Sequence, residues 1–436
     1  MKQRLERYFQ FRELNTNWRT EILAGFTTFI TMAYIIFVNP AILHETGMPL
    51  AAVVAATCLC SAFGSILMGI LARYPIALAP GMGLNAYFTY TVVKAMGIPW
   101  QTALGAVFIS GIAFLLLTFV GIRQMIVSAI PFELYSAVAV GIGLFIAFIG
   151  LRNSGIIVAN QATLVSMGNL RQPNTLLALF GLLLIGALLA WHIKAAILLG
   201  MLITTAVGIV FGLVPWQAQT YSFTDITATA FRLDLSSTAR LGLIEIIFVF
   251  LFVDLFDNVG TLVAVGKKAG LFNQEGQIPR INRILFSDAS ATIVGSLAGT
   301  STVVSYIESA AGVVAGGRSG VTAIVVGLLF LLSMFVAPIV GAIPAAATAP
   351  ALIIVGSMMI GHAAEIPWSN PVIAISSFLT IIAIPLTFSI ANGLAFGFTA
   401  YTILQVARGE GRTVNWLVYV LTALFIARFI YLGALA

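Results

Sequence analysis

Apolar stretches of about 20 residues recur along the whole chain, and the polar loops between them reach about 20 residues at most. A helix of about 20 residues spans the roughly 30 Å hydrocarbon core of a membrane. Hydrophobic residues make up 60% of the 436 and charged residues only 8%, whereas roughly a quarter of a soluble domain is charged. The sequence therefore predicts an all-α, multi-pass membrane protein without a large soluble domain.

The net charge of +6 indicates membrane topology rather than nucleic-acid binding. Basic residues gather before the first apolar stretch and between two later ones: Arg4, Arg7, Arg12, Arg19, Lys267, Lys268, Arg280 and Arg283. Loops rich in Lys and Arg remain cytoplasmic. Residues 1–21 lack the apolar core of a cleavable signal peptide, so we expect a cytoplasmic N-terminal segment and a location in the cell (plasma or inner) membrane.

Fourteen candidate spans follow from the apolar stretches: 22–42, 50–72, 82–96, 101–121, 132–151, 175–191, 194–214, 242–266, 284–298, 306–316, 320–342, 345–361, 371–384 and 387–407. The last two divide one apolar run, 371–407, which would reach about 55 Å as a single helix. Pro385 supplies a break, because proline cannot donate to the helix ladder, and two crossings return Arg408 to the cytoplasmic side. A further apolar segment, 415–434, carries Arg428 and either spans the membrane or lies against the protein body.

Two matched irregular stretches indicate an internal repeat. Residues 72–93 (ARYPIALAPGMGLNAYFTYTVV) open with prolines and glycines, and residues 295–317 (GSLAGTSTVVSYIESAAGVVAGG) open with glycines and a Thr/Ser/Val run. Such residues disfavour helix, so each stretch is predicted to be a short extended segment followed by a half-helix. Two inverted halves would bring the half-helix N-termini to one site at the membrane midplane. The alternative is that both are ordinary glycine-rich packing helices.

Acidic residues stand inside two of the apolar stretches. Asp254 and Asp257 lie in residues 245–265 (EIIFVFLFVDLFDNVGTLVAV), and Glu308 lies in the second irregular stretch. A charge at the bilayer centre costs at least about 2.5–3.5 kcal/mol on insertion scales, so such residues usually face a cavity or a partner. Asp254 and Asp257 share a helix face, which Thr261 continues one turn later. These positions are candidates for the binding site of a transporter.

Each candidate also has a structural interpretation. Asp254 and Asp257 would be structural if a buried base paired with them, although the spans near them in sequence lack Lys and Arg. Glu308 would be an N-terminal cap of the half-helix, and Asn85 would join neighbouring helices.

Other polar residues in the spans have simpler explanations. The hydroxyls of Thr27, Thr28 and Thr31 are expected to bond to carbonyls of their own helix. Asp288 is expected near the membrane surface at the start of a helix, where an acid suits the helix dipole. Cys58 and Cys60, two apart in one apolar helix, are expected to be buried small hydrophobes.

The candidate site mainly offers hydrogen-bond acceptors. Carboxylates and an amide suit a neutral, planar molecule rich in N–H donors, and they repel anions such as sulfate or bicarbonate. Purine bases have this pattern, and Tyr87, Phe88 or Phe256 would cover a ring face. The carboxylates can also take up a proton or attract Na⁺. The residues alone thus predict a cation-coupled carrier of a small polar or aromatic solute.

Several long motifs closely resemble those of the AzgA-like purine permeases, within the nucleobase:cation symporter-2 (nucleobase–ascorbate) superfamily. They are AGFTTFITMAYIIFVNPAIL (24–43), ARYPIALAPGMGLNAYF (72–88), GIGLFIAFIGLRNSGIIVAN (141–160), FVDLFDNVGTLVAV (252–265), GTSTVVSYIESAAGVVAGGRSG (299–320) and ATAPALIIVG (347–356). The resemblance extends over nearly the whole chain.

The resemblance implies fourteen spans in two inverted repeats of seven. Four ranges would form two domains: 22–121 (spans 1–4) and 242–342 (spans 8–11) the core, 122–241 (spans 5–7) and 343–407 (spans 12–14) the gate. Residues 408–436 would add an apolar segment beyond the usual spans. The substrate would sit between the third, tenth and eighth spans and move by an elevator-like shift of the core.

The resemblance also implies import of adenine, guanine or hypoxanthine with protons. Carried over by motif, the base-binding residues become Asp257 in DNVGT and Glu308 in ESAAG, with Asn85 in GLNAYF nearby. Asp254 matches no acid found throughout the family. The preferred base and the choice between proton and Na⁺ stay open.

The full expectation for the site combines both arguments. The substrate-binding candidates are Asp257, Glu308, Asn85, Thr28, Thr261 and Tyr87, and the proton-coupling candidates are Asp254, Asp257 and Glu308. The expected partners are a purine nucleobase, a co-transported proton and the lipid bilayer, with a homodimer left open and no nucleic acid. No catalytic group, metal site or cofactor is expected.

Two alternatives differ from a purine carrier. An anion carrier of the sulfate or bicarbonate type shares the general architecture. Its site would need a basic residue or uncapped helix N-termini at the position of Glu308. A membrane-embedded enzyme would need a nucleophile–base pair or a metal cluster, whereas His44, His192 and His362 are scattered between the spans.

Overall fold

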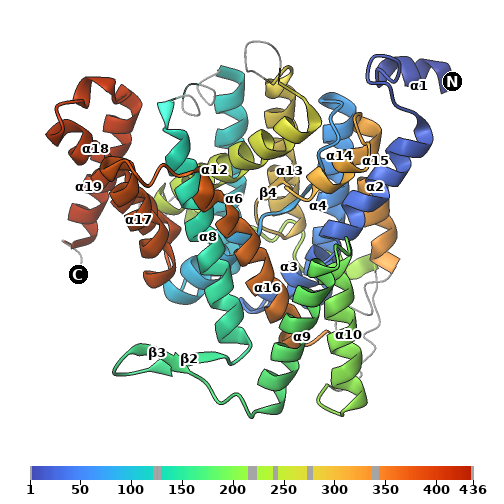
Figure 1. The fold of residues 1–436 in the computed structure, drawn as a ribbon, viewed down its shortest axis with the longest axis horizontal. Helices are drawn as coiled ribbons and strands as arrows, with labels where there is room; N and C mark the ends of the chain where they lie inside the picture. Colours follow the sequence, from blue (N-terminus) through green and yellow to red (C-terminus); the bar gives the residue numbers. More distant parts are fainter. Residues whose placement is uncertain are drawn as a thin grey trace. The chain divides into compact units, whose positions relative to one another are not determined.

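The computed structural model describes residues 2–120, 125, 129–214, 223–238, 244–272, 278–335 and 343–433. Helices dominate it, together with two short two-stranded sheets (Figure 1). The predicted span ends at 121, 242–243, 336–342 and 434 lie outside the described residues.

The elements of the N-terminal half are α1 (Lys2–Tyr8), α2 (Trp18–Met32), α3 (Ile35–His44), α4 (Leu50–Leu71), β1 (Leu78–Pro80), α5 (Met82–Ala86), the π-helix η1 (Tyr87–Ala95), α6 (Trp100–Val120), α8 (Phe132–Asn153), β2 (Ile157–Asn160), β3 (Leu164–Met167), α9 (Pro173–Ala190) and α10 (Ala196–Val210). Those of the C-terminal half are η2 (Phe223–Ala228), α11 (Leu235–Thr238), α12 (Ile244–Ala269), α13 (Ile281–Ala298), β4 (Val303–Ser305), α14 (Ser309–Val314), α15 (Gly320–Ser333), α16 (Ala345–Met359), η5 (Ile360–Glu365), α17 (Pro371–Leu386), α18 (Ile390–Ala407), η6 (Gly411–Thr413) and α19 (Trp416–Gly433).

The expectation of a multi-pass helical protein is confirmed. Within the described residues, eight helical segments are long and apolar enough to cross a membrane: Trp18–His44, Leu50–Leu71, Trp100–Val120, Phe132–Asn153, Pro173–Ala190, Glu245–Ala269, Ala345–Glu365 and Ile390–Ala407. Four shorter apolar helices accompany them: Ala196–Val210, Gly320–Ser333, Pro371–Leu386 and Trp416–Ala427. The count of fourteen spans stays a prediction.

The predicted division of residues 371–407 into two helices is confirmed. Pro385 lies in the last turn of α17, which ends at Leu386, and α18 begins at Ile390. Phe388, in the connecting turn, has a φ of +49°, a left-handed conformation that ends the regular helix. The following apolar segment is also helical, as α19, but the side chain of Arg428 lies outside the described residues.

Both irregular stretches have the predicted form of an extended segment followed by a short helix. β1 precedes α5, and β4 precedes α14. The two strands, which are far apart in sequence, pair antiparallel with Leu78 opposite Ser305 and Pro80 opposite Val303. The continuation of α5 as the π-helix η1 is not foreseen by the sequence.

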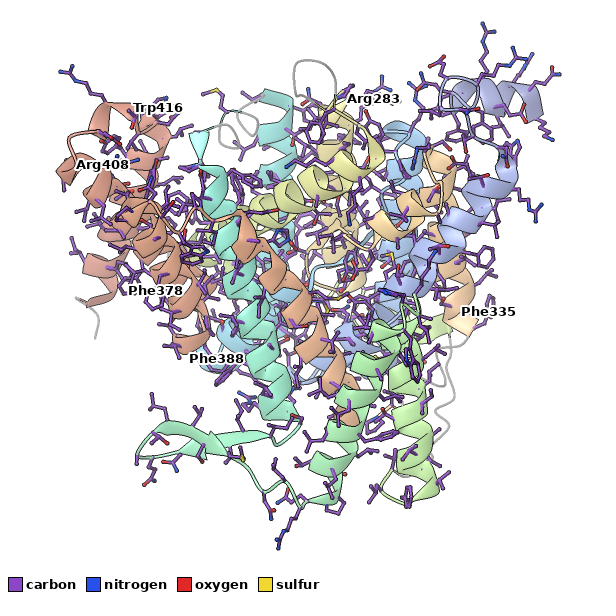
Figure 2. The ribbon with its side chains drawn as sticks, in the orientation of Figure 1. Arg283, Phe335, Phe378, Phe388, Arg408 and Trp416 are labelled. Atoms are coloured by element: carbon purple, nitrogen blue, oxygen red, sulfur yellow. The ribbon has the colours of Figure 1, made fainter. Side chains whose placement is uncertain are left out.

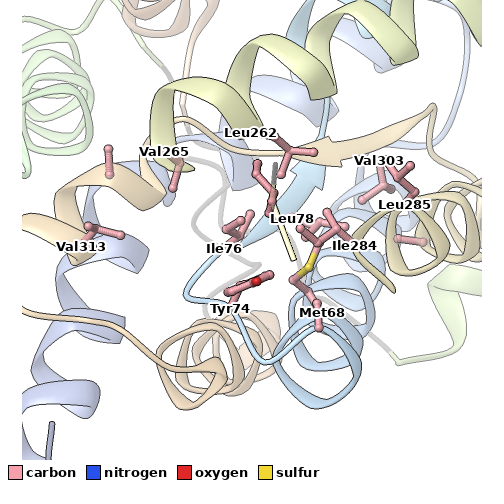
Figure 3. Packing of buried hydrophobic residues seen from close by; sticks show 14 of the residues in the cluster. Met68, Tyr74, Ile76, Leu78, Leu262, Val265, Ile284, Leu285, Val303 and Val313 are labelled. Carbon is pink, nitrogen blue, oxygen red and sulfur yellow. The ribbon is translucent and has the colours of Figure 1, made fainter. Parts of the chain in front are cut away.

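The chain divides into two compact units. One comprises Met1–Leu116 and Ile149–Ile354, and the other comprises Leu117–Phe148 and Val355–Ala436. In the first unit, apolar side chains from α4, α12, α13, α14 and both β1 and β4 pack into one cluster (Figure 3), which includes Met68, Tyr74, Ile76, Leu78, Leu262, Val265, Ile284, Leu285, Val303 and Val313. The paired strands are therefore embedded in a packed core.

Glycines allow close helix crossings in both units. A Cβ atom on Gly69 of α4 would clash with the carbonyl of Gly320 at the start of α15, and a Cβ on Gly320 would clash with the carbonyl of Gly69. In the second unit, a Cβ on Gly143 of α8 would lie 2.8 Å from the carbonyl oxygen of Gly356 in α16. Small residues at such crossings let helix backbones pack closely inside membranes.

Large apolar side chains cover outward faces of the helices (Figure 2), for example Phe335 after α15 and Phe378 of α17, which are 73% and 56% exposed. Lipid solvates such side chains as well as a protein interior does. Arg283 and Arg408, in contrast, are exposed near the helix ends where an interface would lie. This distribution fits a protein whose apolar surface faces lipid.

Candidate functional site

The paired strands β1 and β4 form the framework of the candidate site. Beyond the pairing itself, Gly81 N donates to Thr302 O and Tyr306 N donates to Ala77 O, both at 2.9 Å. The Tyr306 hydroxyl also donates to Pro80 O at 2.6 Å. Irregular backbone at membrane depth is tolerated only where protein or water satisfies its polar groups, and here the two segments satisfy one another.

Side chains from neighbouring helices satisfy the outer edges of the strand pair. Ser65 of α4 accepts from Leu78 N (2.9 Å) and donates to Leu78 O (3.1 Å). Thr292 of α13 bonds the N and O of Val303 in the same way, at 3.2 and 3.0 Å. Leu78 and Val303 are the first residues of their strands, so the two hydroxyls repeat the same contact on opposite edges.

Glu308 stands at the N-cap position of α14, but its side chain makes no capping hydrogen bond. Its Oε1 instead accepts from the Tyr34 hydroxyl at 2.6 Å. Tyr34, which is 1% exposed, comes from the break between α2 and α3. The carboxylate is partly exposed, and within the described part of the chain Tyr34 is the one side chain hydrogen-bonded to it. A capping role for the Glu308 side chain is therefore wrong.

Asp257 lies on α12 beside the framework. Its Oδ2 would be 3.5 Å from a Cβ atom on Gly81, so the missing side chain at Gly81 lets the carboxylate approach the backbone after β1. Asp257 is partly exposed, and it lies within electrostatic range of both Glu308 and Asp288. The structure thus brings Asp257 and Glu308, two of the predicted site residues, into one neighbourhood.

Asp254 belongs to a separate, buried network. It is 2% exposed, and its Oδ1 accepts from Asn258 Nδ2 at 2.8 Å. The same nitrogen donates to Asp288 Oδ2 at 2.7 Å, while Asn258 Oδ1 accepts from Ser305 N at 3.1 Å. One amide therefore connects two carboxylates on α12 and α13 to strand β4.

The expectation for Asp288 is wrong. It is fully buried, well inside α13 rather than at a helix start near the membrane surface. The helix begins at Ile281, earlier than the predicted residue 284, and Asn258 supplies the polar contact that makes this burial acceptable. A buried carboxylate needs such a hydrogen-bond partner, because desolvation without one is costly.

Asn85 is fully buried in α5, the short helix that follows β1. Its Oδ1 accepts from the Ser301 hydroxyl. Its Nδ2 has no hydrogen-bond partner among the described residues. A buried amide donor without a partner costs about 1–3 kcal/mol. The unpaired Nδ2 of Asn85 therefore indicates a position for a hydrogen-bond acceptor of a ligand.

The remaining candidates are more enclosed. Thr28 is fully buried against Gly312 of α14, and its hydroxyl has no partner within the described part of the chain. Thr261 is 7% exposed, one turn after Asp257 on α12. Tyr87 is 1% exposed and packs edge-on against Phe250, with ring centroids 5.2 Å apart. Thr31 bonds the carbonyl of Thr28 at 2.7 Å, as expected for a threonine within a helix.

Sequence reasoning missed the part that four polar residues play in the site. Tyr34 and Asn258 are not named as candidates, and Asp288 is expected near the membrane surface rather than buried. The fourth is Asn39 of α3, whose Nδ2 donates to the hydroxyls of Thr57 at 2.7 Å and Thr300 at 3.0 Å. All four stand inside apolar stretches, and a polar side chain there is itself a signal of a partner or a function.

Asp257 and Glu308 take part in none of the ion pairs found within the part of the chain that the structure describes. Those ion pairs include Lys94–Glu45, His362–Glu365 and Arg408–Glu410. For Asp257 and Glu308, the interpretation as members of buried salt bridges therefore finds no support. Acids held in apolar spans without a base are typical of membrane carriers.

The helices and this site define a membrane transport protein, a permease rather than an enzyme. Residues 19–398 match the model of a permease family, Xan_ur_permease. The chain belongs to this family, the nucleobase:cation symporter-2 family.

Relatives cover the chain from end to end. A chain of Methanocaldococcus jannaschii is 52% identical, over 98% of this chain and 99% of its own length. The guanine/hypoxanthine permease PbuG of Bacillus subtilis (strain 168) is 46% identical, over 98% of this chain and 100% of its own. The adenine permease AdeP of Escherichia coli (strain K12) is 44% identical, over 99% and 97%.

Solved structures share the fold. The transmembrane domain of the cyanobacterial bicarbonate transporter BicA has a TM-score of 0.65 at 16% identity, covering 85% of this chain and 96% of its own. The murine anion transporter Slc26a9 has a TM-score of 0.62 at 13% identity, covering 90% and 69%. At these identities the likeness concerns the fold alone.

The Asn258 network generates a prediction about stability. Asn258→Leu keeps the side-chain volume but removes the donor to Asp254 and Asp288 and the acceptor for Ser305 N. We expect a loss of about 1–3 kcal/mol for each buried group that loses this partner without replacement. Thermal unfolding of the purified protein in detergent would show a clearly lowered midpoint.

Asn160→Ala is the matched control. Asn160 also accepts backbone hydrogen bonds, from Ala162 N and Thr163 N, but in an exposed turn, so its removal should change the midpoint little. Equal midpoints for Asn258→Leu and wild type would contradict the structural role of the network.

Proposed function

We propose that the protein imports purine nucleobases, namely adenine, guanine or hypoxanthine, across the cell membrane by proton symport. The N-terminus lies in the cytoplasm in this proposal, because the basic loops are concentrated on that side. The observation that carries it is that Asp257 and Glu308 lie in one neighbourhood, while Asn85, on the short helix after β1, keeps an unpaired amide donor. The permeases of known substrate cited above, PbuG and AdeP, carry purine bases and are related over nearly their full length.

The site chemistry matches a purine. Glu308 has one oxygen held by Tyr34 and a second to which no described side chain donates, and Asp257 makes no hydrogen bond within the described part of the chain. Both therefore present acceptors for N–H groups, while Asn85 Nδ2 presents a donor. A purine carries N–H donors and ring-nitrogen acceptors in a single plane, so it can satisfy all three.

The proposed architecture has fourteen spans in two inverted repeats. The core would comprise 22–121 and 242–342, the gate 122–241 and 343–407, and the core would move as in an elevator. The two-fold pattern of contacts supports the repeat, because Ser65 and Thr292 make the same bonds to the first residues of β1 and β4. The likeness to BicA supports the same general fold.

Proton coupling would use the acids of the site. Asp257 and Glu308 would change protonation with the transport cycle, and Asp254 would exchange a proton within its network with Asn258. Two neighbouring carboxylates in a poorly solvated site resist ionising together. Asp254 and Asp288 share one amide, so a proton held between them would relieve their repulsion.

An anion carrier remains the alternative of the same architecture, because BicA and Slc26a9 have this fold. The acids of the site argue against it. Asp257 and Glu308 would repel an anion, and no described base lies in an ion pair with either. The greater identity to the purine permeases points the same way.

Uptake is the first test of the function. Cells without purine uptake of their own that express this chain should accumulate labelled adenine, guanine or hypoxanthine. A competition panel with these bases, xanthine, uracil and a nucleoside identifies the preferred one, and the nucleoside should compete poorly. Uptake of sulfate or bicarbonate without uptake of a purine would overturn the proposal.

Glu308→Gln and Asp257→Asn should each reduce uptake severely while the protein reaches the membrane. Both changes keep the shape of the side chain but turn an acceptor partly into a donor aimed at substrate N–H groups. Loss of one charge-assisted hydrogen bond costs about 1.5–3 kcal/mol, or roughly 10- to 150-fold in affinity. Concentration-dependent uptake measures the change.

Glu410→Gln is the matched control, since Glu410 pairs with Arg408 at an exposed position outside the apolar helices. It should transport like wild type. A Glu308 or Asp257 variant with wild-type rate and affinity would remove that residue from the site.

Asp254→Asn tests the coupling of purine transport to the proton gradient separately from purine binding. An asparagine oxygen can still accept from Asn258, so the network should persist while the exchangeable proton is lost. We expect purine binding and counterflow exchange to continue, and accumulation driven by an inward proton gradient to fall. Uptake at several external pH values measures proton-driven accumulation, and exchange at equal pH on both sides measures binding and carrier movement without it.

Asp234→Asn is the control for this change. Hydrogen bonds from Ser237 and Ser236 lower the pKa of Asp234, a partly exposed residue, to about 2, so it carries no proton near neutral pH. Its variant should keep pH-dependent accumulation. The same result for Asp254→Asn would assign Asp254 to packing, and loss of binding would assign it to the substrate contacts.

A further inference from the structure

The Tyr34–Glu308 hydrogen bond links the first helical span to the half-helix of the second half of the chain. Tyr34 occupies the two-residue break between α2 and α3, where its own carbonyl accepts from Phe37 N and Val38 N at 3.0 Å. Its backbone is thus fixed by helix-like turns on both sides. Its ring is buried, and its hydroxyl donates to Glu308 Oε1 at 2.6 Å.

A close helix contact holds the two partners together. Gly312 lies one turn after Glu308 on α14, and a Cβ atom there would clash with Thr28 Oγ1 and lie 2.7 Å from Ala24 O. The face of α14 that carries Glu308 therefore packs directly against α2. This contact keeps Tyr34 at a constant distance from the carboxylate.

The hydrogen bond leaves the two oxygens of Glu308 in different environments. Oε1 is held by Tyr34, and no side chain of the described residues donates to Oε2. A glutamate side chain that is free to rotate loses conformational entropy when a ligand fixes it. A glutamate already fixed through Oε1 avoids most of that loss and presents Oε2 in a single direction.

We propose that Tyr34 is a positioning residue for substrate recognition, which orients Glu308 so that Oε2 accepts a hydrogen bond from the transported base. This inference rests on the proposed function, because it takes Glu308 as a substrate contact. Tyr34 itself does not contact the base. It acts through the carboxylate, so its removal weakens recognition more than it slows the movement of the carrier.

Tyr34→Phe tests the proposal, because it removes the hydroxyl and keeps the ring. The expected result is a roughly 3- to 10-fold higher KM for the preferred purine, with a maximal rate close to wild type. The dissociation constant of the purified protein for the same base should rise by the same factor. A residue that only supports the fold would lower the maximal rate and the amount of protein instead.

Tyr74→Phe is the matched control. The Tyr74 hydroxyl donates to Pro279 O at 2.7 Å, also within the first unit but to a backbone carbonyl away from the acids. Its variant should keep the wild-type KM. Thermal unfolding of both variants without purine shows whether each is folded.

The outcomes separate this inference from the proposed function. If wild type neither binds nor takes up a purine, the proposed function fails. If wild type does, and Tyr34→Phe has an unchanged KM and dissociation constant, the positioning role is overturned while the function stands. If Tyr34→Phe does not fold, the same measurements on Gly312→Ala test the positioning role. Gly312→Ala displaces α14 from α2 while the side chains of Tyr34 and Glu308 remain present. An unchanged KM in this variant overturns the positioning role of Tyr34.

Discussion

The pairing of β1 with β4 is the contact on which the rest of the first unit depends. Two stretches of non-helical backbone lie among apolar helices, where an unsatisfied N–H or C=O group costs several kcal/mol. Each strand satisfies the inner edge of the other, and Ser65, Thr292 and Asn258 satisfy the outer edges. The positions of α4, α12 and α13 are thereby tied to the strand pair. Removing either strand would leave the inner edge of the other without partners, so each interrupted segment needs the other.

The framework is symmetric, but the chemistry placed on it is not. Glu308 follows Ser305 by three residues, whereas Gly83 occupies the position three residues after Pro80. Asn85 follows Pro80 by five residues, and Ala310 is its counterpart after Ser305. The acceptor of Glu308 and the amide donor of Asn85 each correspond to a small residue at the equivalent position after the other strand. A flat molecule with donors along one edge and acceptors along another fits such a site better than a symmetric ion does.

The sequence was sufficient for those features that local chemistry determines. Helix positions followed from apolar length, and the two extended segments followed from proline, glycine and β-branched residues that disfavour helix. The division at Pro385 followed from the length of the run. The hydrogen-bond partners around the acids could not be predicted, because they come from distant spans: Tyr34, in the first span, donates to Glu308, and Asn258 of α12 donates to Asp288 in the ninth predicted span. Contacts between residues more than 200 apart, such as Tyr34 with Glu308, depend on the strand register, which no local pattern encodes.

The four acids around strand β4 and α12 differ in the groups that hydrogen-bond to them. Asp254 and Asp288 are buried and share the amide of Asn258, so their hydrogen bonds support β4 and the helices around it. Asp257 and Glu308 are partly exposed, and the contacts described for them are few: a glycine for one and a tyrosine for the other. Acids buried against a protein donor are less accessible to a ligand than the partly exposed Asp257 and Glu308 are. Because Asn258 follows Asp257 directly on α12, a shift of this helix would move the buried network and the open carboxylate together. In the proposed function, binding at Asp257 and the protonation of Asp254 would be connected in that way, through one turn of helix.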